Sequence, residues 1–511
     1  MKKLLVLAMM ATLLMAGSAF AVNRHLTPTP NATFQFGAPG VAFGPGSTNN
    51  DDSCDIGVAP AATLLLPYFE VDTVNRTTTT LFTITNVTRF SQIAHVTVWT
   101  DQSVPVLDFN IFLTGYDVQP INLLDILTTG TVASAAGTGP TTAQSPIGSQ
   151  STGAGYTNPN FSTTIGCGAL PGILPTTLVT AVRTALTTGA YAPGGGLAAC
   201  TAIGTAIASG NAHGYVTIDV AANCSTRLPN DPNYYLNDIL FDNVFIGDYE
   251  QLGPAAAGTT ATSFDAGGNA MVHIRAVPEG GRAGGLPGTN LPFTFYDRYT
   301  PATTRTADRR QPLPSTWAAR YIQGGAGLFA TNYKIWREGF GIGVCGTAAT
   351  ASNAVLPIAE IVRFDERENP FVAVGPQNCS PTCGVNPGTL PETSATNTTA
   401  TVYPVLTGTD VGGWMYLNLN NGGSATYSIT SFGTVFNVPP ATGGLAPAGA
   451  STTAGPRPSQ NWVIVEMFGN VVNSPNRLTV DFDAAWLGNG CSPAAFTSTA
   501  NNRTVPIGPA G

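Results

Sequence analysis

Paired carboxylates on one predicted strand are the first candidates for chemistry in this sequence. Asp481 and Asp483 lie in segment 478–487, whose alternation of apolar and polar residues is typical of a β-strand. Side chains two residues apart on a strand share a face at roughly 6.5–7 Å, which overlaps the carboxylate separation of inverting glycosidases. Asp108 with Asn110 is a similar pair. Such pairs also occur on any solvated strand face, so catalysis by Asp481 and Asp483 is the weaker of two interpretations.

An arginine cluster beside a tryptophan is the second candidate site. Arginine forks bind carboxylates, sulfates and phosphates, and an indole stacks on a sugar ring. The cluster therefore suggests a ligand site for an anionic glycan. The alternative, which we favour, is that these arginines pair with Asp297, Asp308 and other acids of the fold. The candidate ligand-binding residues are Arg305, Arg309, Arg310, Trp317 and Arg320, with Arg298 nearby.

Metal and cofactor signals are few. Carboxylates at Asp51, Asp52 and Asp55, and at Asp238 and Asp242, could hold Ca²⁺, which takes oxygen ligands, but no EF-hand loop occurs. We therefore expect no cofactor, with calcium as the one possibility, and no other metal site.

Signatures of hydrolytic enzymes are also missing from the sequence. It contains no G-x-S-x-G elbow and no H-E-x-x-H motif. Of the four histidines, His95 and His273 have apolar neighbours, which predicts buried strand residues. The sequence thus favours a protein that is not an enzyme, without deciding the matter.

The eight cysteines predict disulfides. An even number in an exported chain indicates a disulfide framework, whose pairing the sequence alone does not decide. Two local trios, 167–224 and 345–383, suggest one internal bridge each, and one cysteine of each trio would then bond to the first or the last cysteine. The eight are Cys54, Cys167, Cys200, Cys224, Cys345, Cys379, Cys383 and Cys491.

Export is predicted by the first 21 residues. Lys2 and Lys3 precede an apolar run from Leu4 to Met15, and residues 19–21 form a small-x-small cleavage site. This signal peptide, cleaved near Ala21, predicts a secreted, periplasmic or cell-surface protein of bacterial type. The rest of the sequence has no apolar stretch long enough for a transmembrane helix.

Charge is scarce in this chain and negative in balance. Charged residues make up 10% of the sequence, against about a quarter in ordinary soluble domains. The net charge is −8, and removing two lysines with the signal leaves 19 − 29 = −10. Nucleic acid is therefore not an expected partner, because such proteins neutralise phosphates with clustered basic residues. Other envelope proteins or glycans are the partners that we consider.

Short strands separated by Gly- and Pro-rich loops predict an all-β fold of one or two β-sandwich domains. Segments 81–88, 94–101, 107–113 and 214–220 are typical strands, whereas 175–189 predicts one short helix between Pro175 and Gly189. The expected organisation is a signal peptide (1–21), a flexible arm (22–53), a first β domain with a loop and helix insertion (54–252), a linker (253–268), a second β domain (269–491) and a polar tail (492–511).

Several passages resemble segments of uncharacterised exported bacterial proteins. They are LPYFEVD (66–72), HVTVWTD (95–101), GYVTIDV (214–220), RRQPLPSTWAARY (309–321) and VDFDAAWLGNGC (480–491). The resemblance implies export and brings no functional residue with it. Our first hypothesis is a disulfide-stabilised structural or binding protein at the cell envelope or outside the cell. The alternative is a secreted glycan-acting hydrolase that uses paired strand carboxylates.

Overall fold

The structure is a computed structural model of the 511-residue chain. It describes residues 59–132, 161–162, 167, 173–194, 199–200, 203–204, 210–229, 231, 233–253, 264–276, 313–324, 329–337, 356–368, 370–374, 389–390, 393–397, 411–421, 460–470, 477–483 and 485–489.

The described chain is mostly β-strand in several antiparallel sheets, which confirms the all-β class. In the first half, a five-stranded sheet has the order β4-β3-β6-β1-β9 and a four-stranded sheet the order β5-β2-β7-β8. Their strands are β1 (Thr63–Val71), β2 (Thr79–Asn86), β3 (Gln92–Trp99), β4 (Pro105–Leu113), β5 (Val118–Asn122), β6 (Ala212–Ala221), β7 (Phe245–Leu252), β8 (Phe264–Ala270) and β9 (Val272–Ile274).

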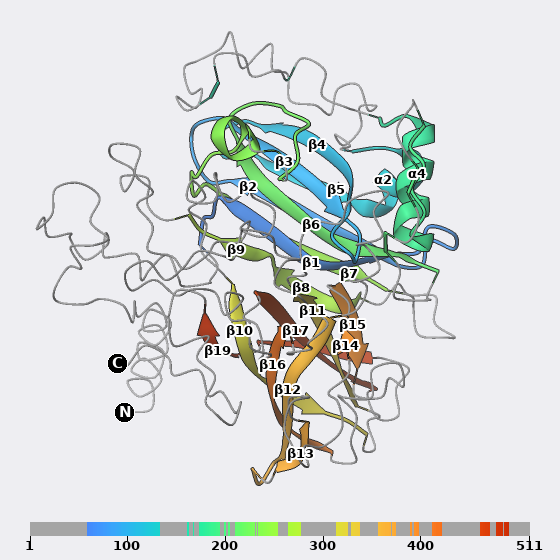
Figure 1. The fold of residues 1–511 in the computed structure, drawn as a ribbon, viewed down its shortest axis with the longest axis vertical. Coiled ribbons are helices and arrows are strands. Elements are labelled where there is room, and N and C mark those ends of the chain that lie inside the picture. Colours follow the sequence, from blue (N-terminus) through green and yellow to red (C-terminus); the bar gives the residue numbers. More distant parts are fainter. Residues whose placement is uncertain are drawn as a thin grey trace, which may run out of the picture.

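The second half contributes two further sheets. One has the order β13-β12-β16-β10-β19 with β14 beside β12, and the other has the order β15-β11-β17-β18. Their strands are β10 (Pro314–Ile322), β11 (Ala330–Arg337), β12 (Leu356–Asp365), β13 (Pro370–Val374), β14 (Thr389–Leu390), β15 (Thr393–Asn397), β16 (Gly412–Asn421), β17 (Asn461–Asn470), β18 (Arg477–Asp483) and β19 (Ala485–Asn489). Figure 1 shows these strands below those of the first half.

Two short helices pack on the first half. Helix α4 (Thr176–Thr188) follows Pro175 and ends at Gly189 with a φ of 71°, as the sequence predicts. Helix α2 (Leu123–Thr129) was not predicted, because its apolar run is too short for a helical period. It begins where the Asn122 side chain accepts a hydrogen bond from the Leu124 amide. A five-residue π-helix, η4 (Tyr234–Asp238), follows β6.

Two of the predicted strands differ in how far their polar faces are buried. β2 alternates buried and half-buried residues, as its sequence predicts, but β3 is buried at every position. The alternation of apolar and polar residues in 94–101 predicts a half-buried strand, and this is wrong for the polar face of β3. β8 begins at Phe264, within the predicted linker 253–268. The division into two domains and the sandwich arrangement stay predictions.

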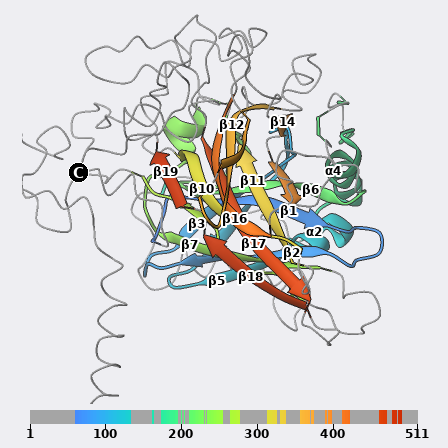
Figure 2. The same ribbon diagram turned by 90° about the horizontal axis from the view of Figure 1, so that it is seen from below.

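In the core of the first half, apolar side chains of β1, β2, β3, β4 and β6 meet those of both helices. In the second half, Trp317 and Leu417 pack against Tyr333 and Val465 from the other sheet. A third cluster joins the halves, because Leu313 and Trp336 pack on Leu65, Trp99 and Tyr215. Seen from below, β11 overlies β1 (Figure 2), with which it is in contact.

Candidate functional site

A row of polar side chains crosses one face of the five-stranded sheet. His95 of β3 lies opposite Asn110 of β4 and Asp219 of β6, and Asp219 lies opposite Thr63 of β1. Directly opposed residues of neighbouring strands project to the same face. The four residues therefore form one continuous row on that face, which we call the polar row.

The polar row is buried in the interior of the protein. Its four side chains are at most 6% exposed. Leu65 and Trp99 on the same face pack with Tyr234, Leu313 and Trp336, which cover it. Water is excluded here, so electrostatic interactions act more strongly than at a surface.

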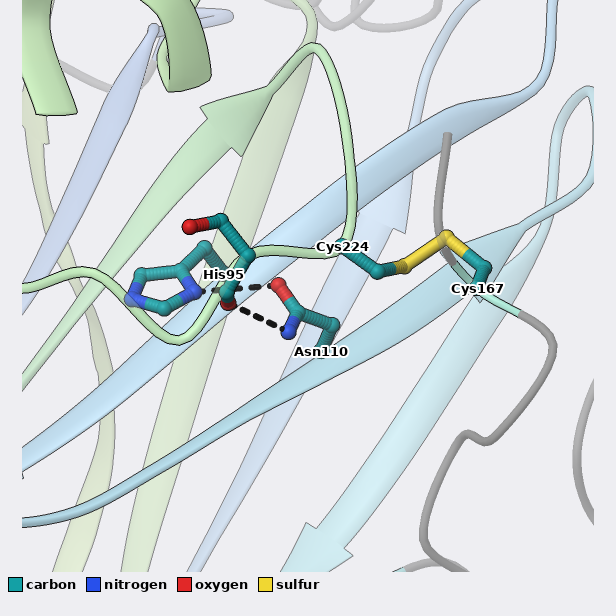
Figure 3. Close-up of a disulfide and its surroundings, with 5 residues drawn as sticks. His95, Asn110, Cys167 and Cys224 are labelled. Carbon is teal, nitrogen blue, oxygen red and sulfur yellow. Dashed lines mark hydrogen bonds between the residues drawn. A yellow bond between two sulfur atoms is a disulfide. The ribbon is translucent and has the colours of Figure 1, made fainter. Parts of the chain in front are cut away.

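Asn110 fixes the protonation pattern of His95. The Asn110 Nδ2 donates to the Ser225 carbonyl at 2.8 Å, which leaves its Oδ1 facing His95 Nδ1 at 3.0 Å. An amide oxygen only accepts, so Nδ1 carries a proton and donates it to Asn110. Figure 3 shows the ring held from its Nδ1 side, with Nε2 on the far side from Asn110.

Asp219 has a partner on each carboxylate oxygen. Thr63 Oγ1 donates to Oδ1 at 2.5 Å, and the Tyr234 hydroxyl donates to Oδ2. The Tyr234 ring also meets the His95 ring edge-on, with the centroids 5.6 Å apart. This carboxylate therefore ties β1, β6 and η4 together.

A second polar row adjoins the first. Thr97 of β3 lies opposite Asp108 of β4 and Thr217 of β6. The Thr97 hydroxyl and one oxygen of Asp108 are buried without a hydrogen-bond partner, as is His95 Nε2. Burial raises the pKa of Asp108 above its usual 3.8, and the nearby charge of His95 acts in the opposite direction. Thr217 instead accepts a hydrogen bond from the Trp99 indole at 2.8 Å.

A separate group of ionisable side chains lies where β1 and β6 approach the second half. The Tyr68 hydroxyl donates to Glu70 at 2.9 Å, and His213 Nε2 lies 3.2 Å from Asp101. Burial raises the pKa of Tyr68 well above 10, and the charges of Glu70, Glu466 and Asp101 add to this. These groups therefore lie close enough to influence one another.

The arrangement offers one base and one carboxylate, but no identifiable nucleophile. His95 Nε2 and one oxygen of the Asp108 carboxylate are buried without a hydrogen-bond partner. Within the described ranges, no three His, Cys, Asp or Glu side chains come together as a metal site. His95 is the buried strand residue that its apolar neighbours predict. Its pairing with Asn110 and the position of Thr97 beside it were not predicted.

The carboxylates proposed for hydrolysis lie on β18, which the sequence predicts. The backbone of Asp481 lies opposite Glu466, and that of Asp483 lies opposite Ile464. Their catalytic role stays a prediction.

The predicted arginine site is described only in part. The indole of Trp317 is 0% exposed and donates to Asn461 Oδ1 at 2.5 Å, so it presents no stacking face to solvent. Arg320 is exposed and pairs with Glu366 at 3.2 Å, as the alternative interpretation expects. Arg305, Arg309 and Arg310 lie outside the described residues, and a ligand site among them stays a prediction.

The candidate calcium ligands are likewise described only in part. Asp238 accepts two hydrogen bonds from Arg227 Nη1, at 2.8 and 2.9 Å, and one from Asn223. Its carboxylate is therefore neutralised by a guanidinium. Asp51, Asp52 and Asp55 lie outside the described residues.

One disulfide of the predicted framework is described. Cys167 and Cys224 are bonded across 57 residues, with their Cα atoms 5.0 Å apart (Figure 3). This is one of the bridges that a local trio was expected to close. Cys200 is also disulfide-bonded. Cys54, Cys345, Cys379, Cys383 and Cys491 lie outside the described residues.

Comparison of the chain with protein-family models, with curated proteins and with solved structures finds no match. Of the helices in the part of the chain that is described, none has the length and apolar character needed to cross a membrane.

Proposed function

We propose that this chain is an exported, disulfide-stabilised β protein with a structural or binding role at the cell envelope or outside the cell. The observation that carries the proposal is the bridge between Cys167 and Cys224. Disulfides persist in oxidising compartments, and the first 21 residues have the pattern of a secretory signal. Both the disulfide and the signal pattern favour export from the cytoplasm.

The burial of the polar residues supports a role that is not catalytic. Asp219, His213 and Glu466 each have a protein partner and are at most 1% exposed. Each of these contacts links segments within one half of the chain, so the three groups support the fold of that half. Envelope proteins and glycans are the classes of partner that we propose for the exposed surface.

Export is tested by producing the full chain and a variant that begins at Val22 in the same bacterial cells. We expect the full chain to reach the periplasm or the medium with a new N-terminus near Val22. The shortened variant should stay in the cytoplasm. Peptide mapping without reductant should then recover Cys167 linked to Cys224 in the exported protein only. Retention of the full chain in the cytoplasm with both thiols reduced would refute the proposal.

A binding role is tested on the exported protein. A panel of neutral and anionic glycans and a preparation of envelope proteins serve as probes, with heat-unfolded protein as the control. Saturable binding of a partner supports the role, whereas turnover of a glycan would replace it with hydrolysis.

A further inference from the structure

We propose that His95 and Asp108, with the Thr97 hydroxyl beside them, form a binding site for a divalent transition-metal ion of the Zn²⁺ class. The starting observation is that His95 Nε2, Thr97 Oγ1 and Asp108 Oδ2 are all buried without a hydrogen-bond partner. His95 is 1% exposed and Thr97 is 0% exposed. Buried polar atoms normally have a hydrogen-bond partner, so three buried atoms without one on the same sheet face indicate a bound ion.

The three atoms belong to adjacent positions of one face. Thr97 follows His95 by two residues on β3, and Asp108 lies directly opposite Thr97 on β4. Residues two apart on a strand share a face, and opposed residues of neighbouring strands share it as well. The three side chains therefore occupy the corners of one small triangle on the sheet.

The Nε2 side of the imidazole lies away from the disulfide. Figure 3 shows Nε2 on the side of the ring away from both Asn110 and the disulfide. The disulfide marks the other end of the strands, because Cys167 packs against Ile93 and Phe112, one row beyond His95 and Asn110. The side away from it is the side of Thr97 and Asp108.

The charge pattern calls for a cation. Asn110 Oδ1 accepts from Nδ1, which leaves Nε2 as the ring nitrogen that a metal ion would bind in place of a proton, and an ionised carboxylate is also a ligand. Two such ligands and a hydroxyl are complementary to a positive ion, since the hydroxyl oxygen is also able to coordinate. The pair of one imidazole nitrogen and one carboxylate oxygen suits Zn²⁺ and its neighbours in the first transition row.

The surroundings of His95 match those of a metal ligand. Ligating histidines usually donate the second ring N–H to a carboxylate or carbonyl oxygen, which fixes the ring. Asn110 supplies that oxygen, and its own amide is anchored on the Ser225 carbonyl. Asp108 is partly exposed on β4, an edge strand of the sheet, which gives an ion a way in. Water would complete the coordination.

The test is an isothermal calorimetric titration of the tag-free, oxidised mature protein with Zn²⁺. We expect one saturable site that Asp108→Asn abolishes. Asn110→Ala, which removes only the support of the ring, should weaken binding roughly tenfold to a hundredfold. The matched control is Asp248→Asn, because Asp248 is also a strand aspartate beside a threonine but is exposed. This control should bind as the wild type does.

Nitrogen NMR of the wild-type histidines provides a readout that needs no variant. Zn²⁺ should shift the Nε2 resonance of one imidazole, and the shift should be missing when Asp108→Asn is titrated. The inference is overturned if the wild type shows no saturable binding, if no Nε2 resonance moves, or if Asp108→Asn binds as tightly as Asp248→Asn.

Discussion

Lys334 of β11 and Glu466 of β17 form an ion pair within the core, where their side chains are 5% and 1% exposed. Lys334 is the only lysine of the chain outside the signal segment. Two further cations are buried nearby: Arg337 donates to the Leu419 carbonyl at 2.6 Å, and the Arg363 guanidinium lies 4.6 Å from the centre of the Tyr321 ring. In a protein with little charge, part of that charge is therefore used inside the second half.

The buried pair predicts a large difference between single and double substitutions. Lys334→Met leaves Glu466 without its ion-pair partner in a desolvated site, and we expect it to lower the free energy of unfolding by about 3–5 kcal/mol. Lys334→Met with Glu466→Leu removes both charges and should recover most of that loss. Urea unfolding of the wild type, both single variants and the double variant measures the coupling energy.

The control for this cycle is the exposed pair of Arg320 and Glu366, whose side chains are both 63% exposed. Its coupling energy should stay below about 1 kcal/mol because solvent screens the charges. Equal coupling energies for the two pairs would contradict the assignment of Lys334 and Glu466 to the core.

The strands of this fold were largely predictable from the sequence, but the burial of the polar face of the five-stranded sheet was not. The alternation in 94–101 correctly predicts that Val96 and Val98 share one face and His95 and Thr97 the other. It does not show that Leu313 and Trp336, far along the chain, cover the polar face. Alternation distinguishes two faces, whereas burial of the polar one depends on contacts distant in sequence.

The candidate site was half predictable for the same reason. Asp108 and Asn110 were noticed as a pair two residues apart, but their roles differ: Asn110 holds His95, and Asp108 lies one row away opposite Thr97. That assignment requires the register of the β3–β4 hairpin. The hairpin has an irregularity between Val98 and Trp99, so counting residues across the turn would misplace the pairs by one.

Asp219 and Asp248 provide a matched test of the polar row. Each is a strand aspartate that accepts from a threonine directly opposite it, Thr63 and Thr83 respectively. Asp219 is 0% exposed, whereas Asp248 lies at the surface. We expect Asp219→Ala to cost about 1–3 kcal/mol of unfolding free energy, since Thr63 and Tyr234 lose their acceptor. Asp248→Ala should stay within about 0.5 kcal/mol, and equal losses would argue against a buried row.

The bridge between Cys167 and Cys224 predicts a loss of stability when both cysteines are replaced by serine. It closes a loop across 57 residues, for which the chain-entropy relation gives about 4 kcal/mol. We expect urea unfolding of the double serine variant to occur at a clearly lower midpoint than that of the wild type without reductant. Reductant should lower the midpoint of the wild type to that of the variant or below it, because it also opens the bridge of Cys200. Coincident curves for oxidised wild type and variant would show that the bridge does not constrain the unfolded chain.

His213 and Asp101 predict a dependence of stability on pH. Burial lowers the pKa of His213, but the hydrogen bond and charge of Asp101, the Asn211 carbonyl and the Glu70 charge reverse this and raise it above 6.5. A histidine whose pKa is raised by folding binds its proton more tightly in the native state. Its stabilisation is therefore complete below about pH 6.5 and is lost as the pH rises through the folded-state pKa.

The measurement is the free energy of unfolding in urea at a series of pH values from slightly acidic to alkaline. The advantage of the wild type over Asp101→Asn should be greatest at the acidic end and should shrink as the pH rises. His213→Gln removes the titrating group and should show a flatter profile than the wild type. An advantage over Asp101→Asn that grows with pH would mean that His213 is neutral in the folded protein and that Asp101 does not raise its pKa.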